Sequence, residues 1–110
     1  MKQKRKDALQ ELLAKVEAGT CSNNGIMFGV FGDEWLECFD AYNGSLDAAL
    51  ALHGAVLPGW AWCLESDDQA ILSCREDHTE IYAQWTSRAN PARGWLIAIL
   101  KALIAQEAPE

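Results

Sequence analysis

Three short runs in which apolar and polar residues alternate follow one another between residues 60 and 86. They cover residues 60–64, 70–74 and 80–86, and the polar residues between them are typical of tight turns. Strands joined by such short connections pair with their neighbours in antiparallel fashion, so the runs predict a three-stranded meander. One face of this meander is apolar and requires cover; its residues are Trp60, Trp62, Leu64, Leu72, Ile81, Ala83 and Trp85.

Segments with helical periodicity on either side of the meander can supply that cover. Apolar residues at three- and four-residue spacing predict helices over residues 7–18, 33–40, 46–57 and 91–108. Asp7, Ser45 and Asn90 occupy N-cap positions, and Pro91 suits the first position of the last helix. Together the elements predict a single α+β domain in the order α-α-α-β-β-β-α. In it the three-stranded antiparallel meander packs against helices as a helix–sheet–helix sandwich.

Two segments are more apolar than a solvated surface requires. Residues 20–32 are rich in glycine and asparagine and predict a loop, whose apolar part, residues 25–32, docks on the core or forms an interface. Residues 91–108 are apolar over so wide an arc that the last helix is either central or in contact with a second subunit. We therefore expect a homo-oligomer that associates through this helix or through residues 25–32.

Charge is divided unevenly along the chain. The net charge is −7, yet four of the nine basic residues lie within residues 1–6, which we expect to form a frayed N-terminal arm. The other 5 basic residues stand against 16 acidic ones over residues 7–110, a net charge of −11. A body of this charge repels nucleic-acid phosphates at long range, so we expect no duplex nucleic acid as a partner.

Cysteine usage and hydropathy indicate a reducing compartment. No apolar run approaches the roughly 20 residues that cross a bilayer, and no secretory stretch follows the basic N-terminus. The four cysteines, Cys21, Cys38, Cys63 and Cys74, lack metal-binding spacing and are expected to be free thiols. The alternative is a pair formed by Cys63 and Cys74, which flank the first hairpin. We expect a cytoplasmic protein without a membrane partner.

No group of residues forms a catalytic motif. His53 shares an apolar helical stripe with Leu46, Ala49, Leu50 and Leu57, and this pattern predicts a core histidine. His78 lies in a turn and is expected to be exposed. Neighbouring carboxylates in turns, such as Asp67-Asp68, are typically solvated. We therefore expect a protein that is not an enzyme and uses neither metal nor cofactor.

Binding of a small anionic molecule is the first of two functions that the residues favour. Trp85, Ser87, Arg88, Asn90 and Arg93 surround the start of the last helix. The free N–H groups of a helix N-terminus and two arginines suit phosphate, and an indole ring can stack a base. These residues predict a site that sequesters a signalling nucleotide.

An acidic patch supports the second function. Asp33, Glu34, Glu37 and Asp40 fall on one side of the helix predicted over residues 33–40, opposite Trp35, Leu36, Cys38 and Phe39. Such a patch suits the basic surface of another protein, and the chain would then act as an inhibitor that imitates nucleic acid. A structural part in a larger assembly is a third possibility. The apolar last helix alone would provide the contact surface that such a part needs.

Three segments resemble the phage ABA sandwich domain family. They are residues 12–20 (LLAKVEAGT), residues 39–62 (FDAYNGSLDAALALHGAVLPGWAW) and residues 90–106 (NPARGWLIAILKALIAQ). The resemblance implies a helix–sheet–helix sandwich encoded by a phage or prophage, without an established activity. It would place the protein in the host bacterial cytosol. Nucleotide capture or anti-CRISPR-like inhibition of a host defence protein would there act as counter-defence, and the structural alternative would be a virion component.

Overall fold

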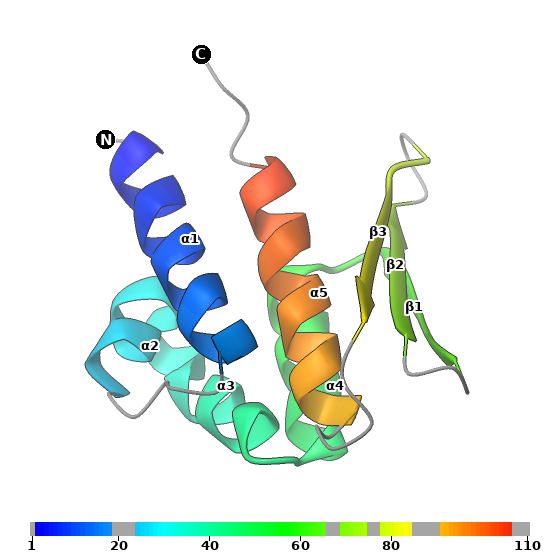
Figure 1. The fold of residues 1–110 in the computed structure, drawn as a ribbon, viewed down its shortest axis with the longest axis horizontal. Helices are drawn as coiled ribbons and strands as arrows, with labels where there is room; N and C mark the ends of the chain where they lie inside the picture. The colour runs from blue at the N-terminus through cyan, green and yellow to red at the C-terminus, as the bar shows by residue number, and fades with distance from the viewer. Residues whose placement is uncertain (1, 19–23, 66–68, 75–77, 85–90, 107–110) are drawn as a thin grey trace.

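A long apolar helix forms the middle layer of the computed structural model, which describes residues 2–18, 24–65, 69–74, 78–84 and 91–106. This helix, α5 (Pro91–Gln106), lies between α1 (Lys2–Ala18) and the sheet (Figure 1). The remaining elements are α2 (Asn24–Phe31), the 3-10 helix η1 (Gly32–Glu34), α3 (Trp35–Tyr42), α4 (Leu46–Val56), β1 (Trp60–Glu65), β2 (Gln69–Cys74) and β3 (Glu80–Gln84).

The sheet is an antiparallel meander in the order β1-β2-β3. Trp62 pairs with Leu72, which in turn pairs with Ile81, and the next apolar row joins Leu64, Ala70 and Ala83. Directly opposed residues point to the same side of a sheet, so the predicted apolar face forms. The strand predicted to end at residue 86 is described to Gln84, and Trp85 lies outside the described residues.

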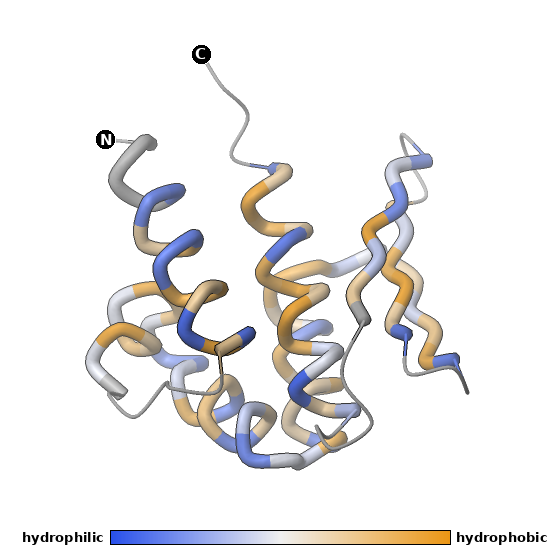
Figure 2. The backbone as a smooth tube through the Cα atoms, in the orientation of Figure 1, coloured by the Kyte–Doolittle hydropathy of each residue, from blue (hydrophilic) through white to orange (hydrophobic). Residues whose placement is uncertain are grey.

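The central position of α5 explains why its sequence is apolar over so wide an arc. Ten of its 16 residues are buried. The helix packs against α1, α3 and α4 as well as against β2 and β3, and Figure 2 shows it hydrophobic along most of its length. Burial inside the chain therefore accounts for the apolar surface from which a subunit contact was predicted.

The predicted loop over residues 20–32 is wrong for its second half, because residues 24–31 form helix α2. Met27, Val30 and Phe31 are buried at helical spacing, and this packing outweighs the low helix propensity of the glycines. Gly32 has φ +59°, a left-handed conformation that glycine adopts without strain, and it stands where α2 ends. Within the described residues the structure therefore has one α-helix more than the predicted order.

Helix α1 begins earlier than predicted. It starts at Lys2 and not after Asp7, so the basic residues predicted as a frayed arm belong to its first turns. Leu9, Leu12 and Val16 form its buried stripe, as the periodicity indicates. The stripe faces α5 and α2.

Helix α4 begins as predicted but presents a different face to the core. The Ser45 side chain accepts a hydrogen bond from the Ala48 N–H at 3.1 Å, which satisfies one of the free N–H groups of the first turn. Ala49 and His53 are buried as predicted, but Leu46 and Leu50 are 43% and 46% exposed, whereas Leu52 is fully buried. The helix is therefore rotated so that two of its leucines point to solvent.

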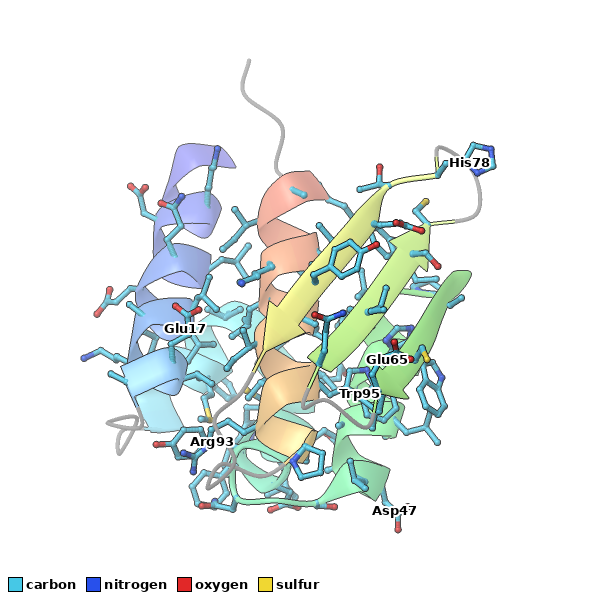
Figure 3. The ribbon with its side chains drawn as sticks, turned by 45° about the vertical axis from the view of Figure 1, so that its right-hand side comes forward. Glu17, Asp47, Glu65, His78, Arg93 and Trp95 are labelled. Carbon is cyan, nitrogen blue, oxygen red and sulfur yellow. The ribbon has the colours of Figure 1, made fainter. Side chains whose placement is uncertain are left out.

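The α+β class with a three-stranded antiparallel sheet packed against helices is confirmed. All described helices lie on one side of the sheet, so the layers run helix–helix–sheet and differ from the predicted helix–sheet–helix order (Figures 1 and 3). Cys63 and Tyr82 are exposed on the other side. None of the described helices has both the length and the apolar character that a membrane span needs.

Candidate functional site

The residues predicted to capture a nucleotide are described only in part. Trp85, Ser87, Arg88 and Asn90 lie outside the described residues. Arg93 belongs to the first turns of α5, and its guanidinium stacks over the Tyr42 ring, with 4.1 Å from Cζ to the ring centroid. Its Nε–H donates to the Tyr42 carbonyl oxygen at 3.1 Å. These contacts join α5 to the end of α3, so Arg93 has a structural role, and nucleotide capture stays a prediction.

The four predicted acidic residues lie on two consecutive elements. Asp33 and Glu34 belong to η1, Glu37 and Asp40 to α3. Asp33 and Asp40 are exposed, and Glu34 and Glu37 are half-buried. The acids therefore remain accessible along one stretch of the surface, as predicted.

Of the apolar residues predicted opposite these acids, only Leu36 differs from the prediction. Cys38 is buried, and Trp35 packs on Phe39 with ring centroids 6.5 Å apart. Leu36, predicted to face the core, is 47% exposed, and it precedes Asp40 by one helical turn. Phe28 on α2, which packs against α3, is 58% exposed. We call these six residues the α2–α3 surface: Phe28, Asp33, Glu34, Leu36, Glu37 and Asp40.

A hydrogen-bonded histidine joins three elements in the interior. The Trp95 Nε1–H of α5 donates to His53 Nδ1 of α4 at 3.2 Å. Because Nδ1 accepts, the ring proton is on Nε2, which donates to the Trp60 carbonyl oxygen at 2.9 Å. Trp62 lies against Trp95 with ring centroids 4.4 Å apart, so the network links α4, α5 and β1.

Burial determines the charge state of this histidine. Only 4% of His53 is exposed. Loss of hydration disfavours the imidazolium and lowers the pKa of His53 below its ordinary value of 6.5, although the bond to the Trp60 carbonyl acts in the opposite direction. The predicted core histidine is confirmed, and neutral His53 serves packing.

This pKa predicts how stability depends on pH. Below pH 6.5 the unfolded chain protonates His53 while the folded chain resists, so the unfolded state binds more protons. The free energy of unfolding should therefore be greatest above pH 6.5 and fall as the pH drops through the lower pKa of the folded state. Urea unfolding between pH 8 and 5 measures this. The variant His53→Leu should show a shallower fall over that window, and equal slopes would contradict the assignment.

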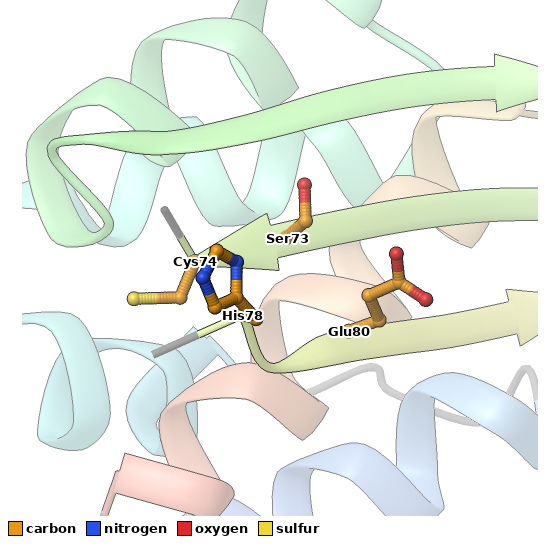
Figure 4. Close-up of a pocket in the computed structure, with 4 residues that line it drawn as sticks. All are labelled: Ser73, Cys74, His78 and Glu80. Atoms are coloured by element: carbon orange, nitrogen blue, oxygen red, sulfur yellow. The ribbon is translucent and has the colours of Figure 1, made fainter. Parts of the chain in front are cut away.

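A pocket of about 280 Å³ lies beside the turn between β2 and β3 (Figure 4). Ser73, Cys74, His78 and Glu80 line it. Figure 4 shows Ser73 and Cys74 pointing to different sides of β2. His78 is exposed, as predicted, and has φ +61°, since the turn needs a left-handed residue at its end. This position is that of a hairpin connection.

The cysteines do not pair across the hairpin. Cys63 is opposite Ile71 and Cys74 is opposite Trp60, so the two thiols lie on different faces of the sheet and both are free. Cys21 lies outside the described residues. The Cys63 Sγ–H donates to Glu65 at 3.4 Å, which raises the pKa of the Cys63 thiol and keeps it protonated.

Sequence reasoning missed two features of the molecule. The partners of His53 are 7 and 42 residues away, and hydropathy carries no signal for such distant contacts. The exposure of Phe28 and Leu36 depends on how α2 and α3 are rotated, which periodicity in an eight-residue helix leaves open.

No three His, Cys, Asp or Glu side chains within the described ranges come close enough to hold a metal ion. The α2–α3 surface is the best candidate for function, since it combines four neighbouring carboxylates with the exposed side chains of Phe28 and Leu36. Comparison of the chain with protein-family models, with curated proteins and with solved structures finds no match.

Proposed function

We propose that this protein acts by binding, without catalysis, and that the α2–α3 surface docks a basic segment of another protein. The observation that carries the proposal is the exposure of Phe28 on α2 and of Leu36 on α3, together with the four carboxylates of η1 and α3. Apolar side chains that anchor in a partner provide most of the affinity at an interface, and charges around them select the partner and speed its approach.

The expected partner is a basic amphipathic helix or a protein that presents one. The net charge of −7 attracts such a partner from a distance and repels acidic ones. Proteins that bind nucleic acid carry basic surfaces of this kind, and occupation of one by the α2–α3 surface would block its normal ligand. If the chain is encoded by a phage, as the resemblance implies, this would be inhibition of a host defence protein.

A matched pair of charge reversals tests the surface. Asp40→Lys changes an exposed acid in the last turn of α3, and Glu17→Lys does the same in the last turn of α1 (Figure 3 labels Glu17). Both substitutions change net charge equally and both suit a helix C-terminus. With a synthetic helix of lysine and leucine as the probe, we expect Asp40→Lys to weaken binding severalfold and Glu17→Lys to leave it nearly unchanged.

Truncation of the apolar side chain of Leu36 should weaken binding more than a single charge reversal does. Leu36→Ala is expected to reduce affinity about tenfold, because truncation of an interface anchor costs more than about 1 kcal/mol. Titrations followed by NMR give both the affinity and the residues that contact the probe, and affinity should fall as salt rises. Equal weakening by Asp40→Lys and Glu17→Lys, or chemical-shift changes confined to other residues, would contradict the proposal.

A further inference from the structure

Strand β1 forms one edge of the sheet, and its hydrogen bonds show which of its backbone groups point outward. The Trp60 N–H donates to the Leu57 carbonyl oxygen at 3.1 Å, and the Trp60 carbonyl oxygen accepts from His53 at 2.9 Å. His53 lies in the last turn of α4 and Leu57 directly follows this helix, so the backbone groups of Trp60 face away from β2. Cys74, opposite Trp60, directs its own N–H and C=O to Thr79 and His78.

Because backbone groups alternate in direction along a strand, Trp62 and Leu64 also point their N–H and C=O away from β2. Within the described residues no hydrogen-bond partner meets these four groups. The edge of β1 is therefore occupied at Trp60 and open at Trp62 and Leu64. Figure 3 shows β1 as the outermost strand, with Glu65 at its end.

The opposite edge, on β3, is treated differently. Lys101 of α5 reaches the Tyr82 carbonyl oxygen, with Nζ at 3.4 Å. A lysine that reaches the edge of a sheet discourages pairing with another strand, because a second backbone would have to displace its charge. β1 has no basic residue, and its one acid, Glu65, stands at its last position. The two edges therefore differ, and only β1 is free of such protection.

We propose that a second copy of this chain adds to β1, so that two β1 strands pair in antiparallel fashion and form one continuous six-stranded sheet. One register satisfies all open groups. It places Trp62 opposite Leu64 of the second copy and Leu64 opposite its Trp62, which forms four backbone hydrogen bonds. The pairing does not extend to Trp60, because its backbone N–H and C=O already bond to Leu57 and His53.

Charge and side chains suit this register. Glu65 stands opposite Ala61 of the second copy, so no two carboxylates oppose each other. Cys63 stands opposite Cys63 of the second copy in a pair without mutual hydrogen bonds, where Cα atoms are about 4.5 Å apart and a disulfide can span the strands. A different protein strand would also fit the open groups, but a second copy supplies matching groups at both positions.

Oxidative crosslinking at Cys63 tests the register. In the full chain with Cys21→Ser and Cys74→Ser, two Cys63 thiols would lose two protons and two electrons to added diamide and form one disulfide. The reaction is run at about pH 9, since the Glu65 contact raises the pKa of this thiol. We expect a product of twice the 12.1 kDa chain mass, lost in Cys63→Ser.

Two engineered cysteines sharpen this test. With Cys63→Ser also present, Ala61→Cys and Glu65→Cys chains should crosslink when mixed, and neither should crosslink with itself. Self-crosslinking of Glu65→Cys would place the strands in another register and overturn the proposed one.

Proline at an outward position tests the backbone bonds. Leu64→Pro removes an N–H that β2 does not use, and Leu64→Ala is the control that loses the same side chain but keeps this N–H. Sedimentation equilibrium up to about 1 mM chain, a range suited to a small interface, should show dimers for the native chain and for Leu64→Ala. Leu64→Pro should stay monomeric while its NMR spectrum remains dispersed.

Salt separates this contact from the docking of a basic partner. Two chains of net charge −7 repel each other, so dimerisation should strengthen as salt rises, whereas docking at the α2–α3 surface should weaken. A native chain that is monomeric at 1 mM in high salt, or a dimer that persists in Leu64→Pro, would overturn the proposal. Neither result bears on Asp40→Lys, so the proposed function is tested separately.

Discussion

Leu52→Ala should lower the free energy of unfolding by about 2–5 kcal/mol, the range found for buried leucines truncated to alanine. Leu52 is fully buried in α4, and its removal leaves a cavity between this helix and the rest of the core. A chain of 110 residues has a total free energy of unfolding of about 5–15 kcal/mol, so the expected loss is a large fraction of the total. Urea unfolding followed by circular dichroism measures the loss.

Leu50→Ala is the matched control in the same helix. Leu50 is 46% exposed, so the same change should cost less than about 1 kcal/mol. The pair also tests the rotation of α4, because the amphipathic pattern predicts Leu50 in the core. A larger loss for Leu50→Ala than for Leu52→Ala would mean that the helix is rotated toward the predicted face.

His53→Leu is expected to cost about 2–4 kcal/mol at pH 8. Leucine fills a similar volume but leaves the buried Trp95 Nε1–H and the part-buried Trp60 carbonyl without their partner. An unsatisfied buried group costs about 1–3 kcal/mol, and a part-buried one costs less because water reaches it. The loss should appear as a lower urea midpoint with an unchanged slope.

A double-mutant cycle separates the hydrogen bond from the packing. Trp95→Phe removes the indole donor, so His53→Leu should cost less in that background than in the native chain. His53→Gln, which has both an acceptor and a donor, should lose less than His53→Leu. Additive losses would show that the bond between Trp95 and His53 contributes nothing to stability.

Much of the fold is predictable because it depends on local patterns. The alternation of apolar and polar residues predicts the bounds of β1, β2 and β3 to within one or two residues. Ser45 and Pro91 stand at the helix starts that capping chemistry predicts. The pattern fails at α2, where glycines at positions 25, 29 and 32 indicate a loop but Met27, Val30 and Phe31 bury enough surface to hold a helix.

The candidate site was predictable in its charges and not in its apolar part. Asp33 and Asp40 remain exposed as predicted, because a carboxylate loses too much hydration on burial to enter the core unpaired. Leu36, by contrast, has the same hydropathy whether it packs or not, and the tertiary structure leaves it 47% exposed. An exposed apolar residue has no local signature.

The amino-acid sequence by itself determined which segments become helices and strands, the antiparallel order of the sheet and the acidic character of the surface, since periodicity, capping and charge act over a few residues. Only the tertiary structure decided which side of α4 faces the core, that all described helices gather on one face of the sheet, and that His53 meets Trp60 and Trp95. Those outcomes depend on how the volumes of distant side chains fit together, and close packing is a property of the whole core.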